Sequence, residues 1–356
     1  MAWTRKTRPV AAKKALQPVD QMMTMEDLRS MRAEISKDLG VDLLFGDDEK
    51  LRLRKMALGL SSLDRALNGG FAFDRITLLV GEFSAGKTLL AMMAIKSAQK
   101  LGLPCVFVDV EKTWTEEWAE QLGIRASDVL VARPRTGEKA FDVALGFVKR
   151  RVPVLVMDSL AAMRADAELA SDEDEMFEKQ FIGTSAKLIG RGLSSMMAEN
   201  QGTMIICINQ IREKPGITYG NPETMPGGKA PGFYAWQLIR VRRGAFIEEG
   251  DRRVGYRLKI QVQKNKQGAP FTEAEVPFYY TGEFDEISAL VEIGLELGVI
   301  TQIGGHYTVS FPDQGTGEIT EERVYGRKRL LDLVRENEAV EAALRRAEAR
   351  LPEVDV

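Results

Sequence analysis

The chain has few of the cysteine and histidine residues that serve in redox chemistry and in metal sites with sulfur or nitrogen ligands. Its 356 residues include two cysteines, Cys105 and Cys207, and a single histidine, His306. Both cysteines lie inside apolar runs, so we expect buried, reduced thiols, because a disulfide framework needs more cysteines and an oxidising compartment. His306 is far along the chain from the candidate motifs and is expected to be a surface or packing residue. No pattern for nucleophilic catalysis or for a metal cage is present.

The chain also lacks an excess of charge of one sign. With 49 Lys and Arg against 52 Asp and Glu, the net charge is −3, which excludes a generic polycation. Binding to nucleic acid would therefore depend on local basic surfaces. No apolar run reaches transmembrane length, and the basic start "MAWTRKTRPVAAKKALQP" lacks the apolar segment of a secretory signal. We expect a cytoplasmic protein without a membrane partner.

The patterning predicts three parts. Residues 1–50 read as a basic arm and a helix, "TMEDLRSMRAEISKDLG", with Thr24 as N-cap and Gly40 as its end. In residues 51–283, apolar strands alternate with amphipathic helices, which is typical of an α/β fold with a parallel sheet covered on both faces. From Trp236 the apolar period changes to two, so antiparallel strands are expected to extend that sheet. Residues 284–356, with a helix, the short strand "HYTVSF" and two charged helices, are expected to form a small α/β domain.

A phosphate-binding motif lies between a predicted strand and a predicted helix. The segment "GEFSAGKT" fits G-x-x-x-x-G-K-[ST] in the context that this motif requires. Its glycines let the backbone N–H groups face phosphate oxygens, Lys87 would reach the β- and γ-phosphates, and Thr88 would hold Mg²⁺. Asp158, at the end of the strand "VLVMDS", suits the second metal-side carboxylate. The predicted ligands are thus ATP and Mg²⁺, and the predicted loop residues are Gly81, Glu82, Phe83, Ser84, Ala85, Gly86, Lys87 and Thr88.

Hydrolysis needs a group that orients or deprotonates water. The strand "VFVDVEKTW" offers Asp109 and Glu111, which alternation would place on one face, and the more terminal Glu111 is the better candidate. On spacing alone, Glu111 can equally be a solvated acid at a strand end. Trp118, just beyond, can stack on a base or can be a helix aromatic that packs on the sheet.

The stretch "MIICINQIREKPGITYGNPETMPGGKAPGFYAW" begins as a buried strand and continues as a long loop, which a compact domain rarely keeps without a use. Gln210 stands where the strand ends. Its carboxamide can donate to a γ-phosphate and would fix how the loop leaves the sheet. The alternative is a strand-end amide that is bonded to neighbouring backbone.

These motifs together resemble the bacterial RecA recombinase family, including its phage-encoded relatives. "LGLSSLDRALNGGFAFDRITLLVGEFSAGKT", "VFVDVEKTW", "VLVMDSLAA", "INQIR…GNPET" and "QKNKQGAPF" follow one another in the family's order, over residues 56–300. The resemblance implies a RecA-type P-loop NTPase core and an ATP-dependent recombinase that forms helical filaments on single-stranded DNA and pairs it with homologous duplex DNA. A ring helicase or clock-type ATPase of the same fold, or a P-loop kinase, is the alternative. The helicases and clock-type ATPases lack "GNPET" and "KNK-x-x-APF", whereas the two long loops and the extra N-terminal helix argue against a kinase.

The resemblance also implies roles for residues. Glu111 matches the glutamate that activates water, Trp118 the aromatic over the adenine, and Lys264 and Lys266 two lysines that reach the neighbouring subunit's ATP. The segments after Asp158 and after Gln210 match two DNA-binding loops, around which we expect the cations Arg164, Lys187, Arg191, Arg212 and Lys214 to contact DNA.

The sequence departs from the family pattern in places. The P-loop reads "EFSAGKT" in place of "PESSGKT". Pro215 replaces an apolar side chain of the second loop, and Phe181 and Ile182 stand in an unusually acidic first loop.

Overall fold

The structure is a computed structural model that describes residues 23–165, 178–213, 223–282, 284, 286–312 and 316–349. Its contacts divide the chain into two compact units, Met1–Arg52 and Leu53–Val356. No helix within these described ranges is both long enough and apolar enough to cross a membrane.

In the first unit, the helix α1 (Met25–Leu39) has the ends that the sequence predicts. Thr24 caps it, because its hydroxyl accepts from the Asp27 N–H at 3.2 Å and the Asp27 carboxylate accepts from the Thr24 N–H at 2.9 Å. Gly40, with φ of 62°, ends it in the left-handed conformation that favours glycine. A short 3-10 helix, η2 (Glu49–Leu51), follows.

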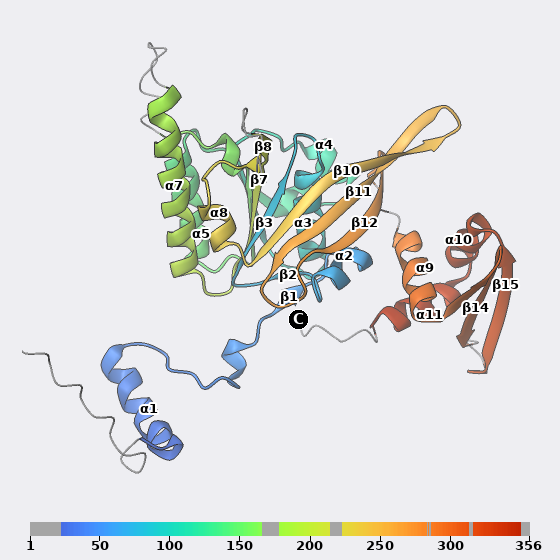
Figure 1. Cartoon of the computed structure of the whole chain (residues 1–356), viewed down its shortest axis with the longest axis horizontal. Coiled ribbons are helices and arrows are strands. Elements are labelled where there is room, and N and C mark those ends of the chain that lie inside the picture. Colours follow the sequence, from blue (N-terminus) through green and yellow to red (C-terminus); the bar gives the residue numbers. More distant parts are fainter. Residues whose placement is uncertain are drawn as a thin grey trace, which may run out of the picture. The chain divides into compact units, whose positions relative to one another are not determined.

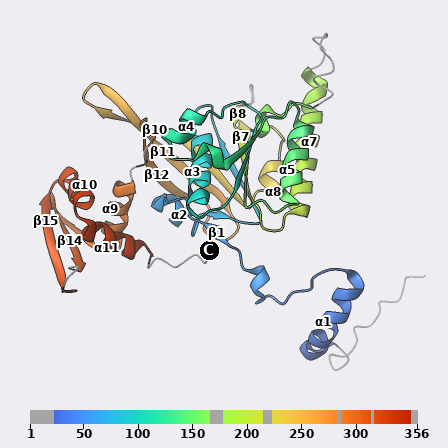
Figure 2. The same ribbon diagram turned by 180° about the vertical axis from the view of Figure 1, so that it is seen from behind.

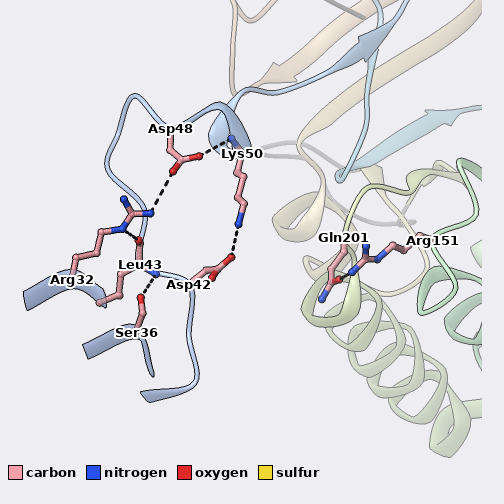
Figure 3. Close-up of polar contacts among 8 residues, drawn as sticks. All are labelled: Arg32, Ser36, Asp42, Leu43, Asp48, Lys50, Arg151 and Gln201. Carbon is pink, nitrogen blue, oxygen red and sulfur yellow. Dashed lines mark hydrogen bonds and ion pairs between the residues drawn. The ribbon is translucent and has the colours of Figure 1, made fainter. Parts of the chain in front are cut away.

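Side chains of α1 hold the segment that follows the helix (Figure 3). Arg32 Nε donates to the Leu43 carbonyl at 2.6 Å, and Ser36 Oγ accepts from the Leu43 N–H at 3.1 Å. Further along, Lys50 Nζ pairs with Asp42 Oδ2 at 3.0 Å. Polar contacts thus hold the segment after α1 against the helix and against η2.

The second unit is built on an eight-stranded sheet of order β12-β11-β10-β3-β7-β6-β4-β5. The bounds of its strands are β3 (Ile76–Gly81), β4 (Cys105–Asp109), β5 (Val129–Ala132), β6 (Val154–Asp158), β7 (Met204–Gln210), β10 (Gln237–Glu249), β11 (Arg252–Asn265) and β12 (Thr272–Tyr279). Strands β10, β3, β7, β6, β4 and β5 pair in parallel, whereas β11 and β12 add antiparallel ladders. The predicted parallel sheet with an antiparallel extension is confirmed.

Short elements and helices surround this sheet. Two small antiparallel pairs are β1 (Lys55–Met56) with β2 (Phe71–Ala72) and β8 (Arg212–Glu213) with β9 (Glu223–Thr224). The helices of the core are α2 (Ser61–Ala66), α3 (Lys87–Lys100), α4 (Glu116–Gln121), η3 (Ala126–Asp128), α5 (Gly137–Val148), η4 (Leu160–Ala162), α7 (Glu178–Glu199) and α8 (Ala230–Tyr234).

The central strands are buried on both faces, as their continuous apolar runs predict. One apolar cluster joins α3 to one face through residues such as Leu90 and Phe107. The other joins α5 and α7 to the opposite face through Phe141, Leu193 and Leu155. Figure 1 shows α7 upright beside α5 and α8, and Figure 2 shows the same core from behind, with the β10–β11 hairpin running out past the other strands in both views.

The strand order places the candidate residues at one edge. Strands β3 and β4 follow each other in sequence, yet β7 and β6 lie between them in the sheet. The carboxyl ends of these four parallel strands meet at one edge, next to the point where the order reverses. Open α/β sheets bind their ligands there.

The C-terminal part has its own apolar cluster, which includes Leu290, Val309, Leu330 and Leu344. Its described residues form one three-stranded antiparallel sheet and three helices: α9 (Glu286–Glu296), β13 (Ile300–Ile303), β14 (His306–Pro312), β15 (Ile319–Tyr325), α10 (Arg327–Glu336) and α11 (Glu338–Ala349). Of these three strands, only β14 was predicted from the sequence. Strand β15, "ITEERVY", is an edge strand with mostly exposed side chains, so it shows no apolar alternation.

Candidate nucleotide-binding site

The P-loop, residues 81–88, turns between β3 and α3 where only glycines fit. A Cβ on Gly81 would lie 2.2 Å from the Val241 carbonyl oxygen, and one on Gly86 would lie 2.5 Å from Leu258 Cδ1. Gly86 also has φ of 99°, a conformation that side chains other than glycine rarely adopt. The chain thus enters α3 with the N–H groups of its first turn free of intrahelical acceptors, which is the arrangement that receives a phosphate.

Lys87 is folded into this loop. Its Nζ donates to the carbonyl oxygens of Gly81 at 3.2 Å and Glu82 at 2.7 Å. Burial lowers the pKa of the Lys87 amine, while the carboxylates of Asp158 and Glu111 act in the opposite direction. The ammonium group therefore lies where a phosphate can replace carbonyl partners.

Thr88 and Asp158 form a pair of oxygen ligands. Thr88 Oγ1 donates to Asp158 Oδ2 at 2.7 Å. The pKa of Asp158 is raised to about 6, mainly by burial; the charges of Glu111 and Asp109 add to the rise, and the Thr88 hydrogen bond and the Lys87 charge oppose it. A hydroxyl next to a buried, crowded carboxylate fits Mg²⁺, which binds few protein oxygens and keeps phosphate and water ligands. Within the described residues no larger group of His, Cys, Asp and Glu forms a metal cage.

Glu111 and Gln210 meet at this edge. Gln210 Nε2 donates to Glu111 Oε1 at 3.3 Å, and the hydroxyl of Ser159 donates to the same oxygen. The backbone N–H of Glu111 donates to the Asp158 carbonyl at 3.2 Å. The structure thus brings together Lys87, Thr88, Glu111, Asp158 and Gln210 from four strand ends.

Asp109 has other partners than Glu111. Strand β4 ends at Asp109, so Glu111 lies in the turn beyond it and strand alternation does not apply. The Asp109 carboxylate is fully buried and accepts from the N–H groups of Thr113 at 2.8 Å and Trp114 at 3.2 Å.

Trp118 packs on the sheet. Its ring meets Phe278 edge-on at 6.3 Å between centroids, and it lies partly buried against the core. A contact with adenine stays a prediction.

Lys264 and Lys266 lie near each other, but only Lys264 belongs to β11, which ends at Asn265. Two residues apart on one strand, the two lysines would share a face, but Lys266 lies beyond the end of β11 and does not. Lys264 Nζ donates to the carbonyls of Gly232 at 2.9 Å and Phe233 at 3.2 Å, at the end of α8. Burial, and secondarily the charge of Lys266, lowers the pKa of Lys264. The Lys266 ammonium lies over the Trp236 ring, 5.1 Å from its centroid.

Four of the predicted DNA contacts are exposed: Arg164, Lys187, Arg191 and Arg212. Lys214 and Pro215 lie outside the described residues, as do the side chains of Phe181 and Ile182. Contacts with DNA stay a prediction for all of them.

Three site residues were missed from the sequence. Ser159 contacts Glu111, and its position directly after Asp158 was the available signal. Arg243 Nη2 donates to the P-loop carbonyl of Ser84 at 2.7 Å, and its guanidinium stacks on Tyr256 at 5.1 Å. Arg133 Nε pairs with Asp109 at 3.1 Å. Nothing in the local sequence of either arginine indicated these long-range contacts.

A glycine loop that opens onto a helix, a lysine folded into that loop and a carboxylate at the end of a nearby parallel strand are the parts of a P-loop nucleotide-binding protein. Comparison with known proteins defines the family. The model of the RecA N-terminal domain matches residues 26–285. The proteins named "Protein RecA" from Thermus thermophilus and Corynebacterium aurimucosum are each 36% identical, over 314 and 297 residues. These alignments cover 86% and 82% of this chain, and 91% and 78% of those proteins. "Protein RecA" of Aquifex aeolicus is 37% identical over 274 residues, 76% of this chain and 78% of that protein. The chain belongs to the RecA family of DNA recombinases.

Proposed function

We propose that this chain is a DNA-dependent ATPase that hydrolyses ATP to ADP and phosphate while it forms a helical filament on single-stranded DNA and pairs it with homologous duplex DNA. The observation that carries the proposal is the contact of Gln210 Nε2 with Glu111 Oε1 at 3.3 Å, beside the P-loop. A carboxylate and an amide that donates to it, both at the carboxyl edge of the sheet, can act on the same water and the same phosphate.

Each residue of the edge has a task in this proposal. Lys87 exchanges a backbone carbonyl for a phosphate oxygen and stabilises the negative charge that develops there. Glu111 accepts the proton of the attacking water at the oxygen that Ser159 and Gln210 now contact. Thr88 and Asp158 would hold Mg²⁺, which neutralises phosphate charge when bound.

DNA would be bound by local cations, because the net charge of the chain is only −3. The proposed contacts are Arg164, Lys187, Arg191, Arg212 and Lys214. The first four are exposed. Gln210 would connect the two functions, since the segment that follows it is the second proposed DNA-binding loop.

The test uses purified full-length variants with ATP, Mg²⁺ and single-stranded DNA. Glu111→Gln should still bind ATP and DNA and form filaments in electron micrographs, while its turnover falls by about 10²–10⁴-fold, the usual contribution of a general base. Lys87→Ala should lose productive nucleotide binding. The matched controls are Glu117→Gln on the exposed face of α4 and Lys100→Ala at the far end of α3. Normal turnover by Glu111→Gln, or rings in place of filaments for the unmodified protein, would contradict the proposal.

A further inference from the structure

Glu111 lies in a turn that is tied at both sides. On the N-terminal side, the N–H groups of Val110 and Glu111 donate to the Asp158 carbonyl at 2.8 Å and 3.2 Å. On the C-terminal side, Asp109 Oδ1 accepts from the Thr113 N–H at 2.8 Å, which folds the chain back onto the end of β4. The turn between these ties therefore fixes where the Glu111 carboxylate points.

The turn includes a conformation that needs support. Lys112, the residue after Glu111, has φ of 59°, in the left-handed region that a lysine seldom adopts. Such a conformation persists where the surrounding contacts impose it. The contacts that close this turn come from the Asp109 carboxylate, which is fully buried.

Arg133, just past the end of β5, completes this closure. Its Nε donates to Asp109 Oδ2 at 3.1 Å, and its Nη2 donates to the Trp114 carbonyl at 2.7 Å. Asp109 Oδ2 also accepts from the Trp114 N–H at 3.2 Å. One planar guanidinium thus contacts both the buried carboxylate and the far end of the turn, a bridge that an ammonium group cannot reproduce with the same geometry.

Arg133 also supplies the charge that Asp109 requires. A buried carboxylate without a cation is costly, and Asp109 lies close enough to Asp158 to act on its charge. The Arg133 side chain is half exposed, and its polar contacts are with Asp109 and Trp114 and not with Glu111, Lys87 or Thr88. Any effect of Arg133 on Glu111 must therefore pass through the turn.

We infer that Arg133 is a positioning residue for catalysis: it locks the 110–114 turn through Asp109 and Trp114 and so holds Glu111 toward the P-loop. The inference rests on the proposed role of Glu111 as the base. It assigns no contact with nucleotide to Arg133.

The experiment compares Arg133→Ala and Arg133→Lys with the unmodified full chain. The matched control is Arg125→Ala, which removes an exposed ion pair with Asp128 at the start of the same strand. DNA-dependent turnover and KM for ATP are measured together with amide hydrogen exchange at Thr113 and Trp114.

The expected results differ between turnover and binding. For Arg133→Ala we expect turnover to fall by about 10–100-fold, the effect of a displaced catalytic group. KM and filament formation should change by less than about threefold. Exchange at the two amides should accelerate, and the control should behave as the unmodified protein.

Arg133→Lys keeps the charge but not the bridge, so it should give an intermediate loss and carries the test if the alanine variant does not fold. In a Glu111→Gln background, Arg133→Ala should cost less than about twofold more, because the two substitutions remove one function. Unchanged exchange at Thr113 and Trp114, unchanged turnover in both arginine variants, or losses that multiply in the double variant would overturn the inference. Normal turnover of Glu111→Gln alone would instead refute the proposed role of Glu111. The exchange data would still decide whether Arg133 holds the 110–114 turn.

Discussion

Folding and metal binding favour different protonation states of Asp158: burial favours the neutral carboxyl group, whereas Mg²⁺ binds the carboxylate. Its side chain is 1% exposed, and burial raises its pKa to about 6 from an ordinary 3.8. In the folded protein without metal, the carboxyl group binds its proton more tightly than in the unfolded chain. Its contribution to the free energy of unfolding therefore falls as the pH rises from about 4 to about 6 and stays low above that range.

We therefore expect Asp158→Asn to stabilise the protein at pH 7–8 when nucleotide and metal are absent. A shift of about two pKa units corresponds to about 3 kcal/mol, and this gain should fall toward zero as the pH drops below about 4, because Asp158 then becomes protonated in both states. Denaturant unfolding in EDTA across this pH range measures it. Mg²⁺-dependent turnover should be lost in the same variant.

The control for this prediction is Asp142→Asn, which removes an exposed carboxylate paired with Lys139 on α5 and should show no such pH-dependent gain. A variant at Asp158 that is less stable than the unmodified protein at pH 8 would mean that the contacts of the carboxylate with Thr88 and Lys87 outweigh its burial.

At this scale the sequence predicts residues whose chemistry is encoded locally. The P-loop spacing identifies Lys87 and Thr88, and a polar residue after an apolar strand identifies Asp158 and Gln210. Arg133 and Arg243 could not be found in this way, because each contacts a segment far away in sequence and an arginine near a strand end is usually solvated.

At the scale of elements, the end of β7 is linked by hydrogen bonds both to the loop region that follows it and to the nucleotide site. Strand β7 is buried up to Asn209, whose side-chain Nδ2 donates to the Pro226 carbonyl at 2.9 Å, and it ends at Gln210. The amide of Gln210 contacts Glu111, so both ends of the loop region are tied to the nucleotide edge. A change in the contacts of Gln210 can therefore alter how the loop leaves the sheet.

We predict that Gln210→Ala separates nucleotide binding from DNA binding. ATP affinity without DNA should change little, whereas the ratio of DNA affinities measured with ATP and with ADP should collapse toward one, since coupling between two sites is reciprocal. The matched control is Gln201→Ala, which removes an exposed glutamine that contacts Arg151 ahead of β7 (Figure 3). Fluorescence anisotropy of a labelled oligonucleotide measures this ratio for Gln210→Ala and for the control. If the ratio survives in Gln210→Ala, the residue is only structural.

Elements with a buried face were predictable, and elements without one were not. The alternation of apolar strands and helices predicts the parallel sheet, and the change of period at Trp236 predicts β10 to β12. The pairs β1–β2 and β8–β9 were missed because two residues carry no period. Strand β15 was missed because its pairing with β14 depends on backbone hydrogen bonds at an exposed edge.

At the scale of the whole molecule, the position of Lys264 restricts which nucleotide it can reach. Lys264 pairs with Leu238 on β10, and Leu238 pairs with Leu78 on β3. The P-loop begins three residues further along β3, at Gly81, which is about 10 Å away at the rise of a strand. The Lys264 ammonium is turned toward the end of α8 and not toward this loop. We therefore expect Lys264 and Lys266 to serve the nucleotide of a neighbouring subunit.

This expectation is tested by mixing two inactive proteins. Lys264→Ala with Lys266→Ala should bind ATP but lose DNA-stimulated hydrolysis, because its intact P-loop meets no lysines from the next subunit. Lys87→Ala keeps both lysines. In a random equal mixture, about one junction in four joins an intact P-loop to intact lysines, so hydrolysis should return toward that fraction of the normal rate. A triple variant that lacks Lys87, Lys264 and Lys266 should restore nothing when it replaces Lys87→Ala in the mixture. If mixed filaments are seen in electron micrographs and no ratio restores activity, the lysines act within their own subunit, and the Lys264 side chain would have to leave α8 and reach about 10 Å along β3 to the P-loop.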